Sequence, residues 1–266
     1  MPTFNSFNNN SQQEVVQEYD LTNKQTKGLF LTKVFGVMFL CLLITTAVAA
    51  GLGYGFQALL IQSVNNGASI DFSNNLVLVM IGILIVSAIA LLVMSFVLPI
   101  TFMRGKHNII VPLMIYVVLM GIMLSTFTFV FDWVILVESF GITSLIFGTM
   151  ALLGYVSKGR LTGIGFILLG LIIGALGLSL INWLMIMFGG VSAANIQLSW
   201  IVSLLIFAFL MLVTLYDVHR IKKIAEAGAG QDNNLTYYCA YILYSDFIAI
   251  LIRVIYYVAL ITGRRR

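Results

Sequence analysis

The feature that most constrains the fold is a series of seven apolar stretches, each long enough to cross a bilayer as a helix. A span needs about 20 predominantly apolar residues, and the candidates lie at roughly 29–53, 76–98, 109–131, 133–156, 162–188, 197–217 and 235–261. Stretches of this length favour helices over a barrel, because lipid offers the backbone no hydrogen-bond partners. Only 9% of the residues are charged, against roughly 25% in soluble domains. The sequence therefore predicts an all-α integral membrane protein built as a bundle of seven transmembrane helices.

The apolar stretches use nearly the whole chain and leave no room for a separate catalytic domain. We expect a polar cytoplasmic N-terminal arm over residues 1–28, a transmembrane domain over 29–263 and a basic tail over 264–266. The arm is polar and acidic, and we expect it to be disordered or loosely attached.

The cations of the connections predict the orientation of the chain. Ten lysines and arginines lie on the N-terminal side of the first span or in alternate connections, whereas the other connections have none: Lys24, Lys27, Lys33, Arg104, Lys106, Lys158, Arg160, Arg220, Lys222 and Lys223. This asymmetry predicts a cytoplasmic N-terminus, and it explains the net charge of +4 without a nucleic-acid partner. Seven full spans would place the tail "GRRR" outside, and six spans with a re-entrant seventh stretch would place it inside. The length of the last stretch favours seven spans.

Three of the ten acids lie inside apolar stretches: Glu138, Asp217 and Asp246. An ionised acid near the centre of a membrane helix costs roughly 2.5–3.5 kcal/mol even on a lenient scale, so each is a candidate functional residue. Glu138 lies about one turn inside the fourth stretch, and both a structural role and a pathway role are open. Arg253 follows Asp246 by seven residues, which is too far for an i,i+4 pair. Each of these two residues is therefore expected to point at a different helix or at water.

Asp217 and Asp246 stand at similar distances from the turn expected in "AGAGQDNN", about 13–14 residues before it and about 15–16 after it. In an antiparallel helix pair the two acids therefore reach similar heights, and a shared site is geometrically available. If the carboxylates meet, they cannot both ionise cheaply, and they share a proton. Paired hard oxygens suit Ca²⁺, but two carboxylates are too few for a tight cage. Binding of Ca²⁺ would then be weak and linked to pH.

Three minor features have simpler interpretations. His219, two residues after Asp217, is expected to be a solvated loop histidine. In the fifth stretch "GLIIG" places Gly170 and Gly174 four residues apart, a pattern that can let helices approach closely. Cys41 and Cys239 are expected to be small buried hydrophobes.

Four motifs carry a resemblance to a known family: "LYDVHRIKK" and "LYSDFIAILIR" with the two aspartates, "FMRGKHN" after the second stretch and "VESFGITSLIFG" in the fourth. From about residue 30 onward the chain resembles the transmembrane Bax inhibitor motif family, and most closely its bacterial members. The resemblance implies a bundle in which the other helices surround the last one. It also implies a pH-sensitive calcium leak across the membrane, with Ca²⁺, protons and the lipid bilayer as the partners. The short chain and compact tail suggest a bacterial plasma membrane, and an organelle membrane stays an alternative.

The resemblance further assigns roles to individual residues. Asp217 and Asp246 correspond to a proton-sharing pair, and Arg104 corresponds to an arginine that engages the pair as a latch and closes the pathway. Glu138 aligns with an acid of bacterial relatives that has no assigned role. Ala249 stands where relatives often carry an asparagine, which puts the affinity for cations in doubt more than the fold.

Two other functions share features with this chain. Intramembrane aspartyl proteases also use two aspartates, but they carry Gly-x-Gly-Asp and a later proline motif. This chain has "LYSD" instead, and its only prolines are Pro2, Pro99 and Pro112. A proton-coupled small-solute transporter fits buried acids and seven helices equally well. We expect a channel rather than an enzyme, with no resident cofactor and with Ca²⁺ as the permeating or weakly bound ion. The sequence identifies no protein partner.

Overall fold

Helices form all the regular structure in the part of the chain that the computed structural model describes, which is residues 8–65, 70–104, 108–157, 162–189, 193–227 and 233–263. The helices are α1 (Asn8–Asn65), α2 (Ile70–Arg104), α3 (Ile110–Leu124), α4 (Phe127–Val130), α5 (Trp133–Val156), α6 (Thr162–Gly189), α7 (Ala193–Glu226) and α8 (Asn233–Gly263). Seven of the resulting segments are long and apolar enough to span a membrane, with α3 and α4 sharing one of them. The predicted all-α architecture with seven spans is confirmed.

The outward faces of these helices are covered by large apolar side chains. Leu145 on α5 is 74% exposed, Leu78 on α2 is 71% exposed, and Val86 on α2 is 67% exposed. Monomeric soluble proteins rarely carry apolar surfaces of this extent. The exposed apolar surface is therefore the surface that contacts lipid.

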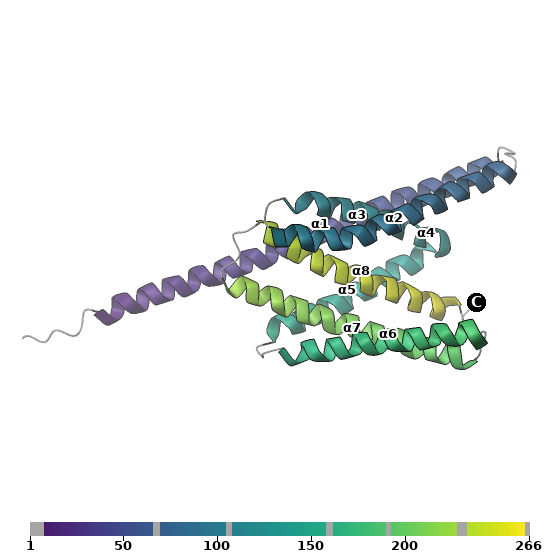
Figure 1. Ribbon diagram of the computed structural model, residues 1–266. Helices are drawn as coiled ribbons and strands as arrows, with labels where there is room; N and C mark the ends of the chain where they lie inside the picture. The colour runs from purple at the N-terminus through teal and green to yellow at the C-terminus, as the bar shows by residue number, and fades with distance from the viewer. Residues whose placement is uncertain are drawn as a thin grey trace, which may run out of the picture.

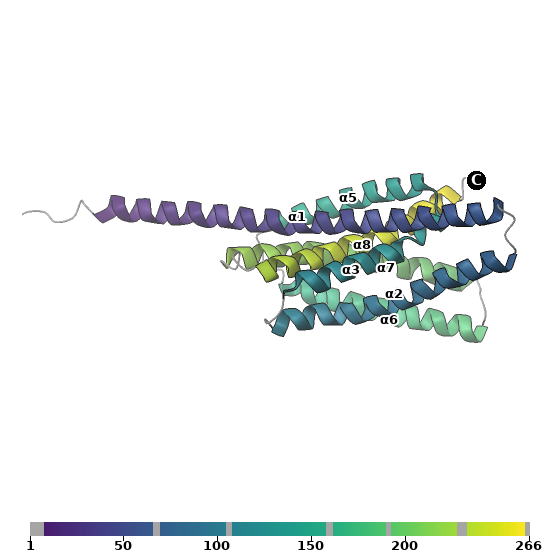
Figure 2. The ribbon, with the colours of Figure 1, turned by 90° about the horizontal axis from the view of Figure 1, so that it is seen from above.

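α8 lies between two groups of helices, as Figures 1 and 2 show from two directions. It packs against α1, α2 and α3 on one side and against α5 and α7 on the other, while α6 packs on the outer side of α7. Leu243, Tyr244 and Ile250 of α8 are completely buried. These contacts support the expected central position of the last helix, which stays a prediction.

The course of α8 bears on the number of spans. It runs as one unbroken helix from Asn233 to Gly263, and it ends at the opposite end of the bundle from the start of α1 (Figure 1). A re-entrant segment would have to turn back within the membrane, so seven spans describe the chain better than six. The basic tail, 264–266, is outside the described residues.

Over its described residues, 8–28, the N-terminal arm is helical, so the expectation of disorder is wrong there, and that of loose attachment stays a prediction. α1 begins at Asn8 and continues without interruption to Asn65, so the arm is a helical extension of the first span. This extension projects beyond the other helices (Figure 2). The reason is that "NNNSQQEVVQEYDLTNKQTK" contains no proline or glycine, so nothing in it interrupts a helix that continues into the membrane.

Close helix packing occurs at glycines other than the two expected. A β-carbon on Gly154 of α5 would lie 2.5 Å from a backbone oxygen of α7, and one on Gly121 of α3 would lie 2.7 Å from Val48 of α1. By contrast, the space beside Gly170 and Gly174 is open to at least 4 Å. The pattern at "GLIIG" therefore marks no close helix contact among the described residues.

Candidate functional site

Asp217 and Asp246 are brought together by α7 and α8, which run antiparallel (Figure 1). The charge of Asp217 acts both on Asp246 and on Cys239 of α8. Those two residues are seven positions apart and share a helical face. The Asp217 carboxylate therefore lies in the neighbourhood of this face of α8. The turn that joins the helices, 228–232, is outside the described residues.

One carboxylate oxygen of Asp246 lacks a hydrogen bond in the described part of the chain. Its Oδ2 atom is buried and has no hydrogen-bond partner within the described ranges. A buried polar atom without a partner is costly, and a second negative charge nearby raises the cost of ionisation. A proton, a cation or water would each lower this cost. The arrangement therefore suits a site that exchanges protons and cations.

Arg220 is a charged neighbour that the sequence did not single out for this site. It follows Asp217 by three residues on α7, and its charge acts on Asp217 and on the buried Cys239. The i,i+3 spacing on one helix is the signal that could have identified it. Because Arg220 is itself exposed, its interaction with Asp217 is partly screened by solvent.

Arg104, the predicted latch, is the last residue of α2, and its side chain is outside the described residues. The end of α2 is nevertheless positioned by Phe102, whose ring stacks on Tyr238 of α8 with centroids 4.1 Å apart. Tyr238 directly precedes Cys239, on which the charge of Asp217 acts. The cytoplasmic end of α2, as predicted from the cations, thus lies at the level of Asp217, and the latch contact itself stays a prediction.

The structure does not bring Glu138 or Arg253 to the aspartate pair. Glu138 lies on an exposed face of α5. Arg253 of α8 donates from Nη1 to Ser203 Oγ on α7 at 3.5 Å, and Ser203 also hydrogen-bonds to the Tyr257 hydroxyl at 2.8 Å. Arg253 therefore points at α7 through a polar cluster two helical turns from Asp246.

Two buried hydroxyl groups on α5 also face the interior of the bundle. The sequence had not identified them as candidate site residues. Ser139 and Thr143 are completely buried, and neither Oγ nor Oγ1 has a partner in the described part of the chain. Phe247, next to Asp246, packs against the two rings that flank Thr143, Phe140 and Phe147, with both centroid separations at 5.5 Å. Thr143 therefore lies near the height of Asp246. The available signal was the spacing of two hydroxyls by four residues on one helical face.

His219 is not the solvated loop residue that we expected. It lies within α7 and is only 5% exposed. Both ring nitrogens are buried without a hydrogen-bond partner among the described residues. The expectation failed because α7 continues as a helix to Glu226, which keeps position 219 on a packed face beside the buried Val218.

The donor set around the pair fits a weakly held, hydrated cation. No group of three or more histidines, cysteines, aspartates or glutamates that could hold a metal ion occurs within the described residues. Ca²⁺ takes six to eight oxygen ligands, so two carboxylates and nearby hydroxyls would leave most positions to water. Such a site suits passage of an ion better than its storage.

Comparison with known proteins identifies one matching family and two similar proteins. Residues 28–263 match the family described as "Inhibitor of apoptosis-promoting Bax1". The chain is also similar to "Inner membrane protein YbhL" of Escherichia coli strain K12, with 28% identity over 226 residues that cover 82% of this chain and 86% of the relative. The protein of the same name from Escherichia coli O6:H1 matches to the same extent. The family match includes all seven spans and both aspartates.

Proposed function

The chain belongs to the family of inhibitors of apoptosis-promoting Bax1, a family of membrane proteins, and from this premise we propose that it is a pH-sensitive calcium leak channel. Protonation of Asp217 and Asp246 gates the pathway, and Arg104 acts as the latch. The observation that carries the proposal is the Asp246 Oδ2 atom, which is buried without a partner among the described residues and lies close enough to Asp217 to be affected by its charge.

Protons and calcium compete for the same oxygens in this mechanism. While the pair shares one proton, it keeps a single negative charge, and the second charge appears only when that proton leaves. Ca²⁺ approaching the pair favours release of the proton, and acid favours its return. The site therefore converts proton concentration into a change of cation affinity.

Arg104 closes the pathway by pairing with the charge that remains on the aspartates. The stacking of Phe102 on Tyr238 supports this role, because it holds the end of α2 beside the segment of α8 on which Asp217 acts. An arginine side chain is suited to such a contact, since its planar fork can bind a carboxylate through two parallel hydrogen bonds. Opening then requires that this contact be released.

The remaining polar groups extend the proposed pathway. Thr143 lies near the height of Asp246, and Ser139 lies one helical turn before it on α5. Both hydroxyls lack partners among the described residues. They can hold water or an ion that has passed the pair. Glu138, one residue before Ser139, and Arg253, on α8, are candidate residues at the other end of the pathway. Neither is needed for the exchange of protons at the pair.

We place the N-terminus in the cytoplasm and the chain in a bacterial plasma membrane. The ten cations on one set of connections support the orientation. The relative's name, which describes an inner membrane protein, supports the location. The proposed function is transport without catalysis and without a resident cofactor.

Calcium efflux from liposomes that contain the full chain tests the proposal. Efflux should vary between acidic and mildly alkaline buffer, and Asp246→Asn should remove this variation because an amide does not exchange a proton. The matched control is Glu226→Gln, which changes an exposed acid at the end of α7. If Asp246→Asn liposomes behave like the unchanged protein at every pH, the aspartate mechanism is wrong. Efflux of other solutes coupled to protons would instead support a transporter, and cleavage of added peptides would support a protease.

A further inference from the structure

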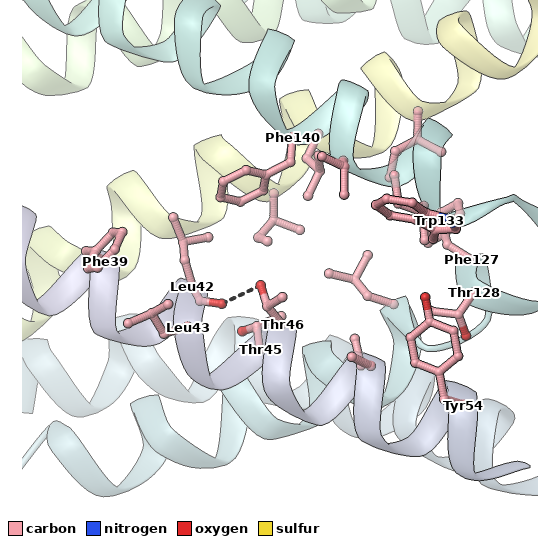
Figure 3. A pocket seen from close by; sticks show the side chains of 18 residues that line it. Phe39, Leu42, Leu43, Thr45, Thr46, Tyr54, Phe127, Thr128, Trp133 and Phe140 are labelled. Atoms are coloured by element: carbon pink, nitrogen blue, oxygen red, sulfur yellow. Dashed lines mark hydrogen bonds between the residues drawn. The ribbon is translucent and has the colours of Figure 1, made fainter.

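A lateral groove with a volume of about 520 Å³ lies between α1 and α5. One wall is α1 from Phe39 to Tyr54, the facing wall is α5 from Trp133 to Phe140, and Leu251 of α8 lies in the floor. Figure 3 shows the α1 and α5 side chains facing each other across the open space. The groove is separate from the aspartate pair, although both use α8.

The rim of the groove is continuous with the surface that faces lipid. Phe39 and Leu43 on α1 are 57% and 50% exposed, and Val137 on α5 is 59% exposed. All three belong to segments that can span a membrane, so their exposed surfaces contact hydrocarbon in the bilayer. Hydrocarbon chains of the surrounding lipid therefore have direct access to the groove.

The hydroxyls inside the groove already have protein partners. Thr46 donates to the carbonyl oxygen of Leu42 at 2.8 Å (Figure 3), and Thr128 donates to that of Ser125 at 2.7 Å. Thr45 hydrogen-bonds to the Tyr244 hydroxyl at 2.6 Å. A polar ligand would lose its hydrogen bonds to water and gain few from these groups. The chemistry of the lining thus selects an apolar occupant.

The groove is long enough to hold an acyl chain from one leaflet. Phe39 and Tyr54 are 15 residues apart on α1, which corresponds to about 22 Å along a helix. Half of the hydrocarbon core of a bilayer is about 15 Å thick. Tyr54 and Trp133 lie at the same end of the groove (Figure 3), and tyrosine and tryptophan prefer the level of the lipid headgroups.

We propose that this groove binds one acyl chain of a membrane phospholipid, with the headgroup at the end marked by Tyr54 and Trp133. The bound chain fills the space between α1 and α5 and packs on Leu251 of α8. The site does not depend on the proposed calcium leak, because it follows only from the membrane location and the shape of the bundle.

Photolabelling tests the site with the full chain in phosphatidylcholine vesicles whose lipids carry a diazirine on one acyl chain. Labelling should concentrate on the peptides that contain 39–54 and 133–140, severalfold above the exposed α6 surface at Trp183, which is 57% exposed. Ala50→Phe should reduce the groove labelling severalfold, because Ala50 lines the groove. Ala47→Phe is the matched control, because Ala47 is exposed on the same helix and is not part of the lining.

A second variant on the α5 wall keeps the test informative if Ala50→Phe does not fold. Val137→Trp fills the groove from α5 at a position that is largely exposed, so it needs no repacking of the core. Size-exclusion profiles and helical circular dichroism identify the variants that fold. Labelling at the groove equal to that at Trp183 would indicate contact with bulk lipid only and would overturn the proposal. Groove labelling unchanged in a folded Ala50→Phe or Val137→Trp variant would overturn it as well.

Discussion

Gly154 of α5 packs directly on Leu215 of α7, so closely that a β-carbon at position 154 would lie 2.5 Å from the Leu215 carbonyl oxygen. Leu215 precedes Asp217 by two residues. This contact therefore fixes the height of the helix segment that carries the first acid of the pair. Backbone atoms cannot rotate away as a side chain can, so the position accepts only glycine without movement of α5 or α7.

Replacing this glycine should separate the two helices. Gly154→Ala is expected to destabilise the protein by about 1–3 kcal/mol, the usual cost of overpacking, and to weaken the pH response of calcium efflux by displacing Asp217. Thermal unfolding in detergent measures the first effect, and the liposome assay measures the second. Gly148→Ala on the same helix is the control: nothing lies within 4 Å of a β-carbon there, so its stability should be equal or higher by up to about 1 kcal/mol. Equal stability of the two variants would contradict the role of the contact.

Calcium should bind less tightly as the pH falls. Protons and Ca²⁺ use the same carboxylate oxygens, so acid reduces the fraction of pairs that are free to bind the cation. Asp217→Asn is expected to weaken binding about tenfold, or about 1.4 kcal/mol, and to flatten its dependence on pH. Calorimetric titration of the reconstituted protein at several pH values measures both quantities. An unchanged affinity in this variant would exclude Asp217 as a ligand.

Loss of the latch should open the pathway. Because a pair that shares one proton still carries one negative charge, Arg104 keeps a partner in acidic buffer. Arg104→Ala is therefore expected to raise calcium efflux at low pH by about tenfold, equivalent to about 1.4 kcal/mol. Arg104→Lys keeps the charge but not the planar fork, and it should give an intermediate rate. No rise in efflux with alanine would remove Arg104 from the mechanism.

Lys222 should stabilise the end of α5. Its Nζ donates to the carbonyl oxygens of Tyr155 at 2.6 Å and Ser157 at 3.4 Å, and it lies 5.2 Å from the centroid of the Tyr155 ring. A cation at a helix C-terminus contributes typically 0.3–1 kcal/mol. Lys222→Ala is thus expected to lower stability by about 1 kcal/mol and to speed hydrogen exchange in the last turn of α5. The neighbouring Lys223, which is exposed, provides the control, and equal exchange in both alanine variants would contradict the contact.

The spans could be predicted from the sequence because their length and composition are local properties. The apolar stretch expected at 133–156 coincides with α5, and the one expected at 162–188 differs from α6 by a single residue. The proximity of Asp217 and Asp246 was also accessible, because an antiparallel hairpin relates positions on either side of its turn by simple counting. α7 and α8 are both longer than the apolar stretches within them, since polar residues at their ends continue the helices.

What the sequence could not provide depends on neighbours that are distant in the chain. Glycines permit close packing, but only the arrangement of the bundle decides that Gly154 meets α7 while Gly170 faces open space. The burial of His219 and the hydrogen bond from Arg253 to Ser203 likewise depend on which face of α7 is covered. The walls of the groove come from helices that are not consecutive in the chain, so no local sequence pattern predicts it.

The position of α8 against both groups of helices has a consequence for biosynthesis. α8 follows six other candidate spans in the chain, so it is synthesised after them. Until then α2 and α3 lack their contacts with α8, although α1 already packs against α7. Premature termination before Asn233 would therefore uncover apolar side chains that pack on α8, among them Phe147, whose ring contacts Phe247.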